Sequence, residues 1–392
     1  PILVLRGGAV TLVDSTKYTG VHFSTTHADI FTPHYAHKEL AARSAASAAL
    51  SVESHIGAIP AAMARTLYYA HVEPHLTFGC EVAIDVRNNC LKPLEDLQRT
   101  YLRRLLGASL HSQIVPLYTE TGVWPIRYRR MELVLRYAKY IVRDGPLFPR
   151  RALQDAVLNA RGQNASWWGD VQHALAALPV PVQMQGWRAG PTLETLDGAT
   201  RDLSKSLAQY LHDGAMASSR LPLIQARFRP LPPGTALHRV ACWRPYLDVQ
   251  RAPHRAAVAR LMVSEHPLAV ETLRHSSHTI PRHWRICRLC GLRECIEDEC
   301  HVLFLCEHDA LAQVRQAFFS AMREQFQVDL TYLLAFSPMS PEAVLVVLLE
   351  RGDVLPLGGY VDAVFHAVQL VPPRVIRSED EWGECPSGVA AQ

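Results

Sequence analysis

The pattern of apolar and polar positions predicts a chain built mainly from α-helices. The clearest signal lies in residues 91–106, where leucine and tyrosine recur at three- and four-residue steps and Gly107 follows as a helix cap. A similar apolar face predicts a helix over residues 126–142. Weaker helical patterns are expected at about residues 34–56, 61–82, 251–274, 308–326 and 341–351.

Strand-like patterns occur only near the start of the chain. Residues 2–5 and 9–13 are short β-prone runs on either side of Gly7 and Gly8, which predicts a hairpin. Residues 17–24 form a third β-prone run. The fold class that follows is mainly α, with a short N-terminal β-hairpin.

Prolines divide the chain into segments. Residues 144–235 contain nine prolines between short helical stretches, which predicts an irregular helical linker that ends near the RPLPPG stretch at 229–234. We expect five segments, with the boundaries 1–33, 34–150, 151–235, 236–326 and 327–392.

Composition is typical of a globular protein, since 48% of residues are hydrophobic and 20% are charged. No apolar run approaches the length of about 18 residues that a membrane-spanning helix needs, and the N-terminal residues lack the features of a signal peptide. We therefore expect no membrane association and an intracellular location, both nuclear and cytoplasmic. Because the chain begins with proline, we expect it to be a fragment of something longer.

Charge is distributed unevenly, although the net charge is only +3. Residues 91–151 contain twelve Lys or Arg against five Asp or Glu, whereas residues 293–309 contain one Arg against six acids. The basic region is the better candidate for contact with phosphates.

The cysteines are concentrated in CRLCGLRECIEDECHVLFLC, residues 287–306, which holds five of the nine in the chain. An odd and modest number of cysteines favours reduced thiols over a disulfide framework, so the cluster indicates a metal site. Cys287 and Cys290 form a C-x2-C pair, and His301 and Cys306 form an H-x4-C pair. These four residues complete the ligand set of a closed tetrahedral zinc site.

Other interpretations of the cluster stay open at this point. Cys300 in place of His301 is the main competing ligand, and Cys295 is left as a spare thiol. A redox C-x2-C is disfavoured because no thioredoxin-like strand and helix surround it. A catalytic zinc is disfavoured because four protein ligands leave no position for water.

Several sequence blocks occur in a specific order: KYTGVHFS at 17–24, ARTLYYAHVEPHLTFGCEV at 64–82, two helical blocks at 94–107 and 119–137, and the C-x2-C…H-x-L-F-x-C segment. Together they resemble the region that follows the polymerase centre in non-LTR retrotransposon reverse transcriptases. The chain departs from that pattern at four positions, which are Thr19, Phe78, Cys300 and Glu307.

The resemblance implies a palm remnant at 1–33, a helical thumb-like domain at 34–150, the linker, a zinc-binding domain at 236–326 and a C-terminal helical segment with an acidic tail. It also implies that template RNA, target DNA and an N-terminal polymerase domain of the same polyprotein are partners. The magnesium ions of the family belong to that polymerase domain, since this chain contains no Asp-Asp dipeptide. We therefore expect structural zinc as the cofactor and no catalytic residue or enzymatic activity in this chain.

Two basic helices are the candidate nucleic-acid contacts, because Arg and Lys on a thumb helix can bind phosphates without reading sequence. Solvated helix faces with local ion pairs are the alternative, more so for the first helix than for the second, in which Glu132 is the only acid between 127 and 143. Trp167 and Trp168 are expected to be packing residues. The candidate contacts are Arg99, Arg103, Arg104, Arg127, Arg129, Arg130, Arg136 and Lys139.

A different class of function also fits the sequence. The acidic surround of the cysteine cluster favours a zinc-stabilised module that binds proteins and has no nucleic-acid role.

Overall fold

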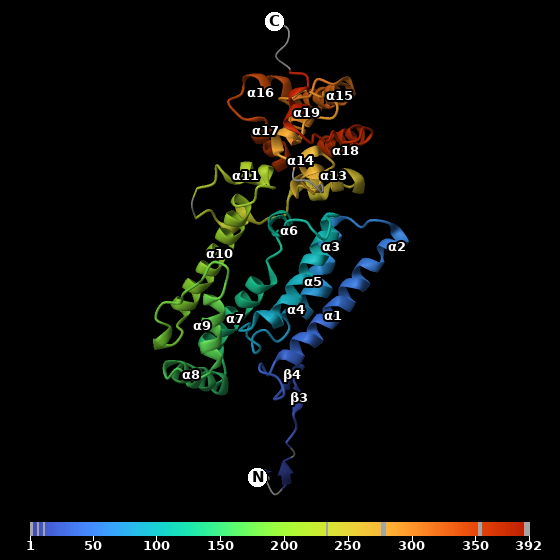
Figure 1. Cartoon of the computed structure of the whole chain (residues 1–392). Helices are drawn as coiled ribbons and strands as arrows, with labels where there is room; N and C mark the ends of the chain where they lie inside the picture. Colours follow the sequence, from blue (N-terminus) through green and yellow to red (C-terminus); the bar gives the residue numbers. More distant parts are fainter. Residues whose placement is uncertain are drawn as a thin grey trace. The chain divides into compact units, whose positions relative to one another are not determined.

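The computed structural model describes residues 3–5, 8–10, 12–232, 234–275, 280–351 and 355–387 (Figure 1). The chain is mainly helical, as predicted, and its strands form two antiparallel hairpins at the N-terminus. It divides into two compact units. Unit 1 comprises residues 1–57, 64–101 and 124–210, and unit 2 comprises residues 58–63, 102–123 and 211–392.

The first hairpin pairs β1 (Leu3–Leu5) with β2 (Gly8–Val10), which confirms the predicted pairing of these two runs. The second pairs β3 (Ser15–Tyr18) with β4 (Val21–Ser24), so the single third run that the sequence predicted is instead a hairpin of its own. Its two-residue turn has positive φ at both positions, Thr19 at 46° and Gly20 at 87°. Such turns match the twist of paired strands.

Unit 1 is built on a helical core in which Tyr68, Leu76, Tyr128, Leu135 and Trp168 are almost fully buried. Helix α1 packs on β4 and α4, and α7 packs on α4, α8 and α9. Three helices, α3 (Ala61–Leu67), α5 (Asn88–Leu106) and α10 (Leu193–Met216), continue from one unit into the other. The remaining helices of unit 1 are α1 (Thr32–Ser51), α2 (Glu53–Ile56), η1 (Tyr68–Val72), α4 (Glu73–Thr77), α7 (Ile126–Asp144), α8 (Leu147–Arg161), α9 (Trp167–Ala176) and η2 (Trp187–Ala189).

Prolines mark helix ends in the region that was predicted as an irregular linker, residues 151–235. Pro146 and Pro149 lie at the start of α8, Pro191 precedes α10, and Pro222 begins α11 (Pro222–Phe228). Proline is well tolerated in the first helical turn, where its missing N–H would have no partner. The region therefore contains most of α8 and all of α9, α10 and α11, and the predicted boundary at 150/151 falls inside α8.

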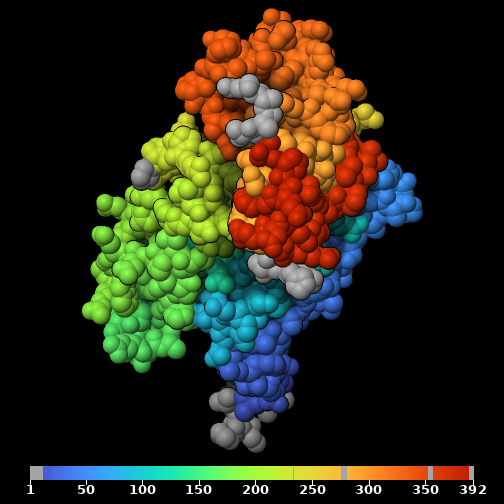
Figure 2. Space-filling model, turned by 45° about the horizontal axis from the view of Figure 1, so that its top comes forward, coloured from blue at the N-terminus to red at the C-terminus, as the bar shows by residue number. Residues whose placement is uncertain are grey.

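Unit 2 contains the C-terminal helices, and in it α18 packs on α13 and α15. Figure 2 shows this red C-terminal segment lying against the orange segments that precede it in sequence. The further elements of unit 2 are α6 (Ile114–Thr121), α12 (Leu237–Val240), η3 (Pro245–Asp248), α13 (Ala252–Met262), α14 (Ala269–Thr272), η4 (Leu273–His275), η5 (Arg282–Trp284), η6 (His301–Leu305), α15 (Asp309–Phe326), α16 (Leu330–Phe336), α17 (Pro341–Glu350), α18 (Leu355–Gln369) and α19 (Glu379–Gly383).

A buried carboxylate joins several elements of unit 2. Glu120 is fully buried at the end of α6, and its Oε1 lies 2.7 Å from Nη1 of Arg227. Its Oε2 accepts a hydrogen bond from the hydroxyl of Tyr246 at 3.0 Å. Arg227 and Arg244 also pair with Glu350 of α17, at 2.7 and 3.0 Å. The network therefore ties α6, α11, η3 and α17 together.

This network is expected to make unit 2 sensitive to acid. Burial alone would raise the pKa of Glu120, but Arg227 and Arg244 outweigh it and hold that pKa below the ordinary value of 4.5. A carboxyl group whose pKa is lower in the folded protein than in the unfolded chain stabilises the fold at pH values above its unfolded-state pKa. This stabilisation is lost as pH falls through the folded-state pKa. Thermal melts of the chain and of Glu120→Gln should therefore differ most near neutral pH and converge as pH falls through the folded-state pKa of Glu120, which lies below 4.5. An equal difference at every pH would contradict this assignment.

Among the described helices, none is both long enough and apolar enough to cross a membrane.

Candidate metal centre and basic surface

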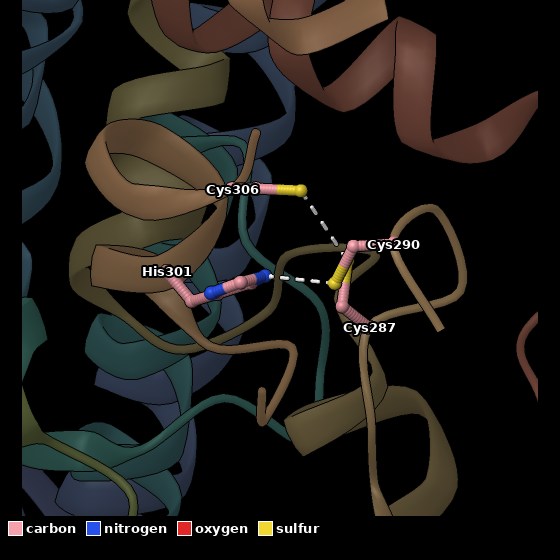
Figure 3. A group of neighbouring side chains, drawn as sticks. All are labelled: Cys287, Cys290, His301 and Cys306. Atoms are coloured by element: carbon pink, nitrogen blue, oxygen red, sulfur yellow. Dashed lines mark hydrogen bonds between the residues drawn. The ribbon is translucent and has the colours of Figure 1, made fainter. Parts of the chain in front are cut away.

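The predicted metal ligands converge in unit 2. Sγ of Cys287, Cys290 and Cys306 and a ring nitrogen of His301 all lie within 4.8 Å of one another. Figure 3 shows His301 and Cys306 projecting from one segment toward the C-x2-C pair. Cys287 and Cys306 are fully buried, and His301 is 8% exposed. The chain therefore forms a Cys3His cluster that can hold a metal ion.

The separations within the cluster match a tetrahedral zinc centre. With Zn–S bonds of about 2.3 Å and a Zn–N bond of about 2.0–2.1 Å, tetrahedral geometry places two sulfurs about 3.8 Å apart and sulfur and nitrogen about 3.6 Å apart. In the structure, Sγ of Cys287 lies 3.8 Å from Sγ of Cys306, and Sγ of Cys290 lies 3.5 Å from Nε2 of His301. The donor set and its spacing thus fit zinc.

A tight turn positions the first pair of thiols. Gly291 has φ of 70° and donates its backbone N–H to the carbonyl of Cys287 at 2.8 Å. Glycine adopts this left-handed conformation without steric cost, so the chain reverses directly after Cys290. Cys287 also donates its N–H to the carbonyl of Cys295 at 2.8 Å, which holds the two sides of the turn together.

A π-helical turn, η6, positions the second pair. Its defining hydrogen bond runs from the N–H of Cys306 to the carbonyl of His301, five residues earlier, at 2.7 Å. In an α-helix, residues five apart point about 140° away from each other, whereas the wider π turn brings them to nearly one face. The H-x4-C spacing therefore places both ligands on the same side.

The acidic residues between the C-x2-C and H-x4-C ligand pairs make contacts that support the backbone around the cluster. Glu297 is fully buried, pairs with Arg288 at 2.7 Å and accepts the backbone N–H of Ala269 at 2.7 Å. Asp298 accepts the N–H of His301 at 3.0 Å, and Glu299 lies 2.9 Å from Nε2 of His266 in unit 2. These three side chains therefore make structural contacts within unit 2.

Proton sharing accompanies the close approach of the four ligands. Hydrogen bonds to Cys290 and Cys306 raise the pKa of the Cys287 thiol, and hydrogen bonds with Cys287 and Cys306 lower that of Cys290. Burial alone would lower the pKa of His301, but hydrogen bonds with Cys290 and Cys306 raise it to about 9.

The two spare cysteines lie outside the ligand set. Cys300 is buried, and burial together with the charge of Glu342 raises the pKa of its thiol. Cys300 is not among the four residues whose ligand atoms converge, which favours His301 as the ligand. Cys295 lies beside Cys290, and burial and the charge of Cys290 raise its pKa to about 11.

The basic residues of α5 are engaged locally. Arg99 pairs with Asp96 at 3.2 Å and with Glu95 at 3.5 Å. Arg103 donates to the hydroxyl and the carbonyl of Ser112, at 3.0 and 3.2 Å. Arg104 is exposed at the end of the helix. The two ion pairs of Arg99 are the ordinary helix-surface pairs that the sequence left as an alternative.

Acids from other segments neutralise most of α7, which the sequence did not reveal. Arg127 pairs with Glu95 at 3.0 Å, and Arg129 pairs with Glu73 at 2.8 Å and with Glu132. Lys139 pairs with Asp197 at 2.7 Å. Arg136 is exposed and has no ion pair among the described residues.

Arg130 requires a correction, because it is only 1% exposed and cannot meet a phosphate. Its Nε lies 2.9 Å from both carboxylate oxygens of Asp85, and its other nitrogens donate to the carbonyls of Leu76 and Ala83 and to the hydroxyl of Tyr35. Arg130 is therefore a core residue of unit 1.

The sequence interpretation missed two groups of residues. Arg288 and Arg315 support the cluster, since Arg288 holds Glu297 and Arg315 donates to the carbonyls of Phe304 and Cys306. The exposed arginines of α8 were not among the candidate contacts, although Arg150 and Arg151 belong to the same basic stretch of sequence.

No family model matches the chain, and neither a curated protein nor a solved structure matches it.

Proposed function

We propose that the Cys3His cluster holds one zinc ion that stabilises the C-terminal module of a nucleic-acid-binding chain. The observation that carries the zinc assignment is the agreement of both measured separations with a tetrahedral centre. Four protein ligands close the coordination sphere, so zinc here stabilises the fold and does not activate water. Cys287, Cys290, His301 and Cys306 would hold the ion.

We further propose that the chain is the thumb, linker and zinc-binding portion of a non-LTR retrotransposon reverse transcriptase. The ordered blocks of sequence support this proposal, and so does the folding of the C-x2-C…H-x4-C segment into one cluster. The chain would bind template RNA and target DNA beside a polymerase domain. With primer–template, magnesium and nucleotides it should extend nothing, and measurable extension would contradict the proposal.

Binding to an RNA–DNA hybrid duplex tests the nucleic-acid role. We expect salt-dependent binding of about micromolar strength, because phosphate contacts release counterions. Arg136→Gln should lower the slope of log K against log salt by about 1, since each duplex phosphate contact contributes about 0.9. The measurement is fluorescence anisotropy at several salt concentrations.

The matched control is Arg43→Gln, which removes an exposed cation that already pairs with Glu39. It changes the net charge equally, and its slope should stay at that of the unchanged chain. Absence of binding at low salt would refute the nucleic-acid role. Equal salt slopes for the two variants would show that Arg136 does not contact a duplex phosphate.

One observation favours a protein-binding role as a second candidate. On α16, Tyr332 and Phe336 are 62% and 74% exposed, and their rings lie 5.3 Å apart. Exposed aromatic pairs are typical of interaction surfaces. Under this alternative, Tyr332→Ser with Phe336→Ser would abolish capture of a partner protein, and nucleic acid would not bind.

A further inference from the structure

The cations of α7 and α8 fall into two groups. Five of them pair with acids, which are Arg127, Arg129, Arg130, Lys139 and Arg143. The other four have no acidic partner within 4 Å among the described residues, and all four are exposed. They are Arg136, Arg150, Arg151 and Arg161, so the positive charge that stays available to a ligand is concentrated on α8.

One side of α8 borders a groove with arginines at both ends. Arg150, Gln154 and Arg161 line a cavity of about 520 Å³, whose floor includes the apolar side chains of Leu153 and Val157. The two arginines are eleven residues apart on one helix face, a rise of about 16 Å. No acid is among the described residues that line this cavity. The groove therefore suits a ligand with repeated negative charges.

The other side of α8 borders an aromatic pocket. Tyr137, Phe148 and Trp167 line a cavity of about 390 Å³, in which Glu81 is the one acid among the described lining residues. The indole N–H of Trp167 donates to the carbonyl of Glu81 at 2.8 Å, which fixes the ring, and the Tyr137 ring meets it edge-on at 6.3 Å. Phe148 is 81% exposed. Trp168, in contrast, is fully buried, so the adjacent tryptophans have different environments.

The two cavities are adjacent, because they share two lining residues. Ile141 and Leu153 line both of them, and the exposed Phe148, Arg150 and Arg151 are nearly consecutive in the chain. An aromatic ring and two guanidinium groups without an acidic partner are thus presented within one helical turn, and Arg150 donates one hydrogen bond to the backbone carbonyl of Arg143 at 3.0 Å. Aromatic platforms beside a basic groove are the combination that binds unpaired bases and their phosphates.

We propose that α8 binds single-stranded nucleic acid, with phosphates on Arg150, Arg151 and Arg161 and one unstacked base in the aromatic pocket. The proposal rests on the nucleic-acid role proposed above and gives it a site. A single strand fits better than a duplex, because only an unpaired base exposes its faces to Phe148, Tyr137 and Trp167. The site lies within unit 1 and does not depend on α5.

The test measures binding of the full chain to a short oligothymidine strand that carries one 2-aminopurine. The triple variant Arg150→Gln, Arg151→Gln, Arg161→Gln should bind at least ten times more weakly. The slope of log K against log salt should fall by about 2, since each single-strand phosphate contributes about 0.7. Phe148→Ala should weaken single-strand binding about 5- to 100-fold and leave hybrid-duplex binding nearly unchanged.

The matched control removes three exposed cations that already pair with acids on their own helices. Arg43→Gln, Lys92→Gln and Lys205→Gln change the net charge equally, because the three pair with Glu39, Asp96 and Asp202. This control should keep the affinity of the unchanged chain. Circular dichroism should show unchanged melting for both triple variants, because all six side chains are exposed.

The outcomes separate the two proposals. If the unchanged chain binds strands and the α8 triple variant binds equally well, the site on α8 is refuted while the nucleic-acid role stands. If the unchanged chain binds neither strand nor duplex, both proposals fail. Equal losses on strand and duplex for Phe148→Ala would refute the base pocket, and stronger competition by an acidic aromatic peptide than by oligothymidine would refute the choice of ligand.

Discussion

Replacing His301 or Cys306 with alanine should strip zinc from the chain and unfold the module around η6. Each change removes one of the four converging donors, and the three that remain do not complete a closed site. Structural zinc contributes an apparent free energy of about 10–16 kcal/mol in small zinc domains. This contribution is comparable to the entire stability of a folded domain, which is about 5–15 kcal/mol.

The measurements are zinc content by mass spectrometry and thermal melting with and without a chelator. The unchanged chain should carry a single zinc ion and lose a melting transition when the chelator removes it. Both variants should melt like the chelated chain and should not respond to added zinc.

Cys300→Ala and Cys295→Ala are the matched controls, because they remove thiols of the same segment that lie outside the ligand set. Both should retain zinc and the zinc-dependent melting transition. Loss of zinc in Cys300→Ala, together with its retention in His301→Ala, would reverse the ligand assignment.

The metal cluster could be predicted from the sequence because its ligands are local. All four lie within residues 287–306, and the C-x2-C and H-x4-C spacings are sufficient to constrain the backbone between them. The structure was needed to choose between His301 and Cys300, because the choice depends on which of the two side chains the η6 turn directs toward Cys290. The π turn aims His301 at Cys290, while Cys300 lies beside Glu342 of a later helix.

The available basic surface could not be predicted in the same way. Glu132 is the only acid between residues 127 and 143, so the sequence alone predicts a free cationic face on α7. Glu73, Glu95, Asp85 and Asp197 reach it from other segments, and such pairing depends on tertiary structure. The charge left for a ligand therefore belongs to α8.

Helix α8 was itself obscured by its prolines. Pro146 and Pro149 were taken as breaks within a linker, yet both lie at the helix start, where proline costs little. The number of prolines alone does not distinguish helix ends from irregular chain. The position of each proline relative to the apolar face of a helix is needed to make that distinction.

Arg130→Met should destabilise unit 1 by about 3–5 kcal/mol, because it leaves a buried Asp85 without its counter-ion. The carbonyls of Leu76 and Ala83 lose a donor as well. For a unit of this size the loss corresponds to a fall in melting temperature on the order of 10 °C. Thermal and denaturant melts of the full chain would measure it.

Arg136→Met on the same helix is the control, and it should change stability by less than about 0.5 kcal/mol because the side chain is exposed. The double variant Arg130→Met, Asp85→Asn should be more stable than Arg130→Met alone, since no buried charge is then left unpaired. Below the melting range, Arg130→Met should bind the hybrid duplex as the unchanged chain does. Weaker duplex binding with unchanged stability would instead show that Arg130 meets phosphates, and it would overturn its assignment to the core.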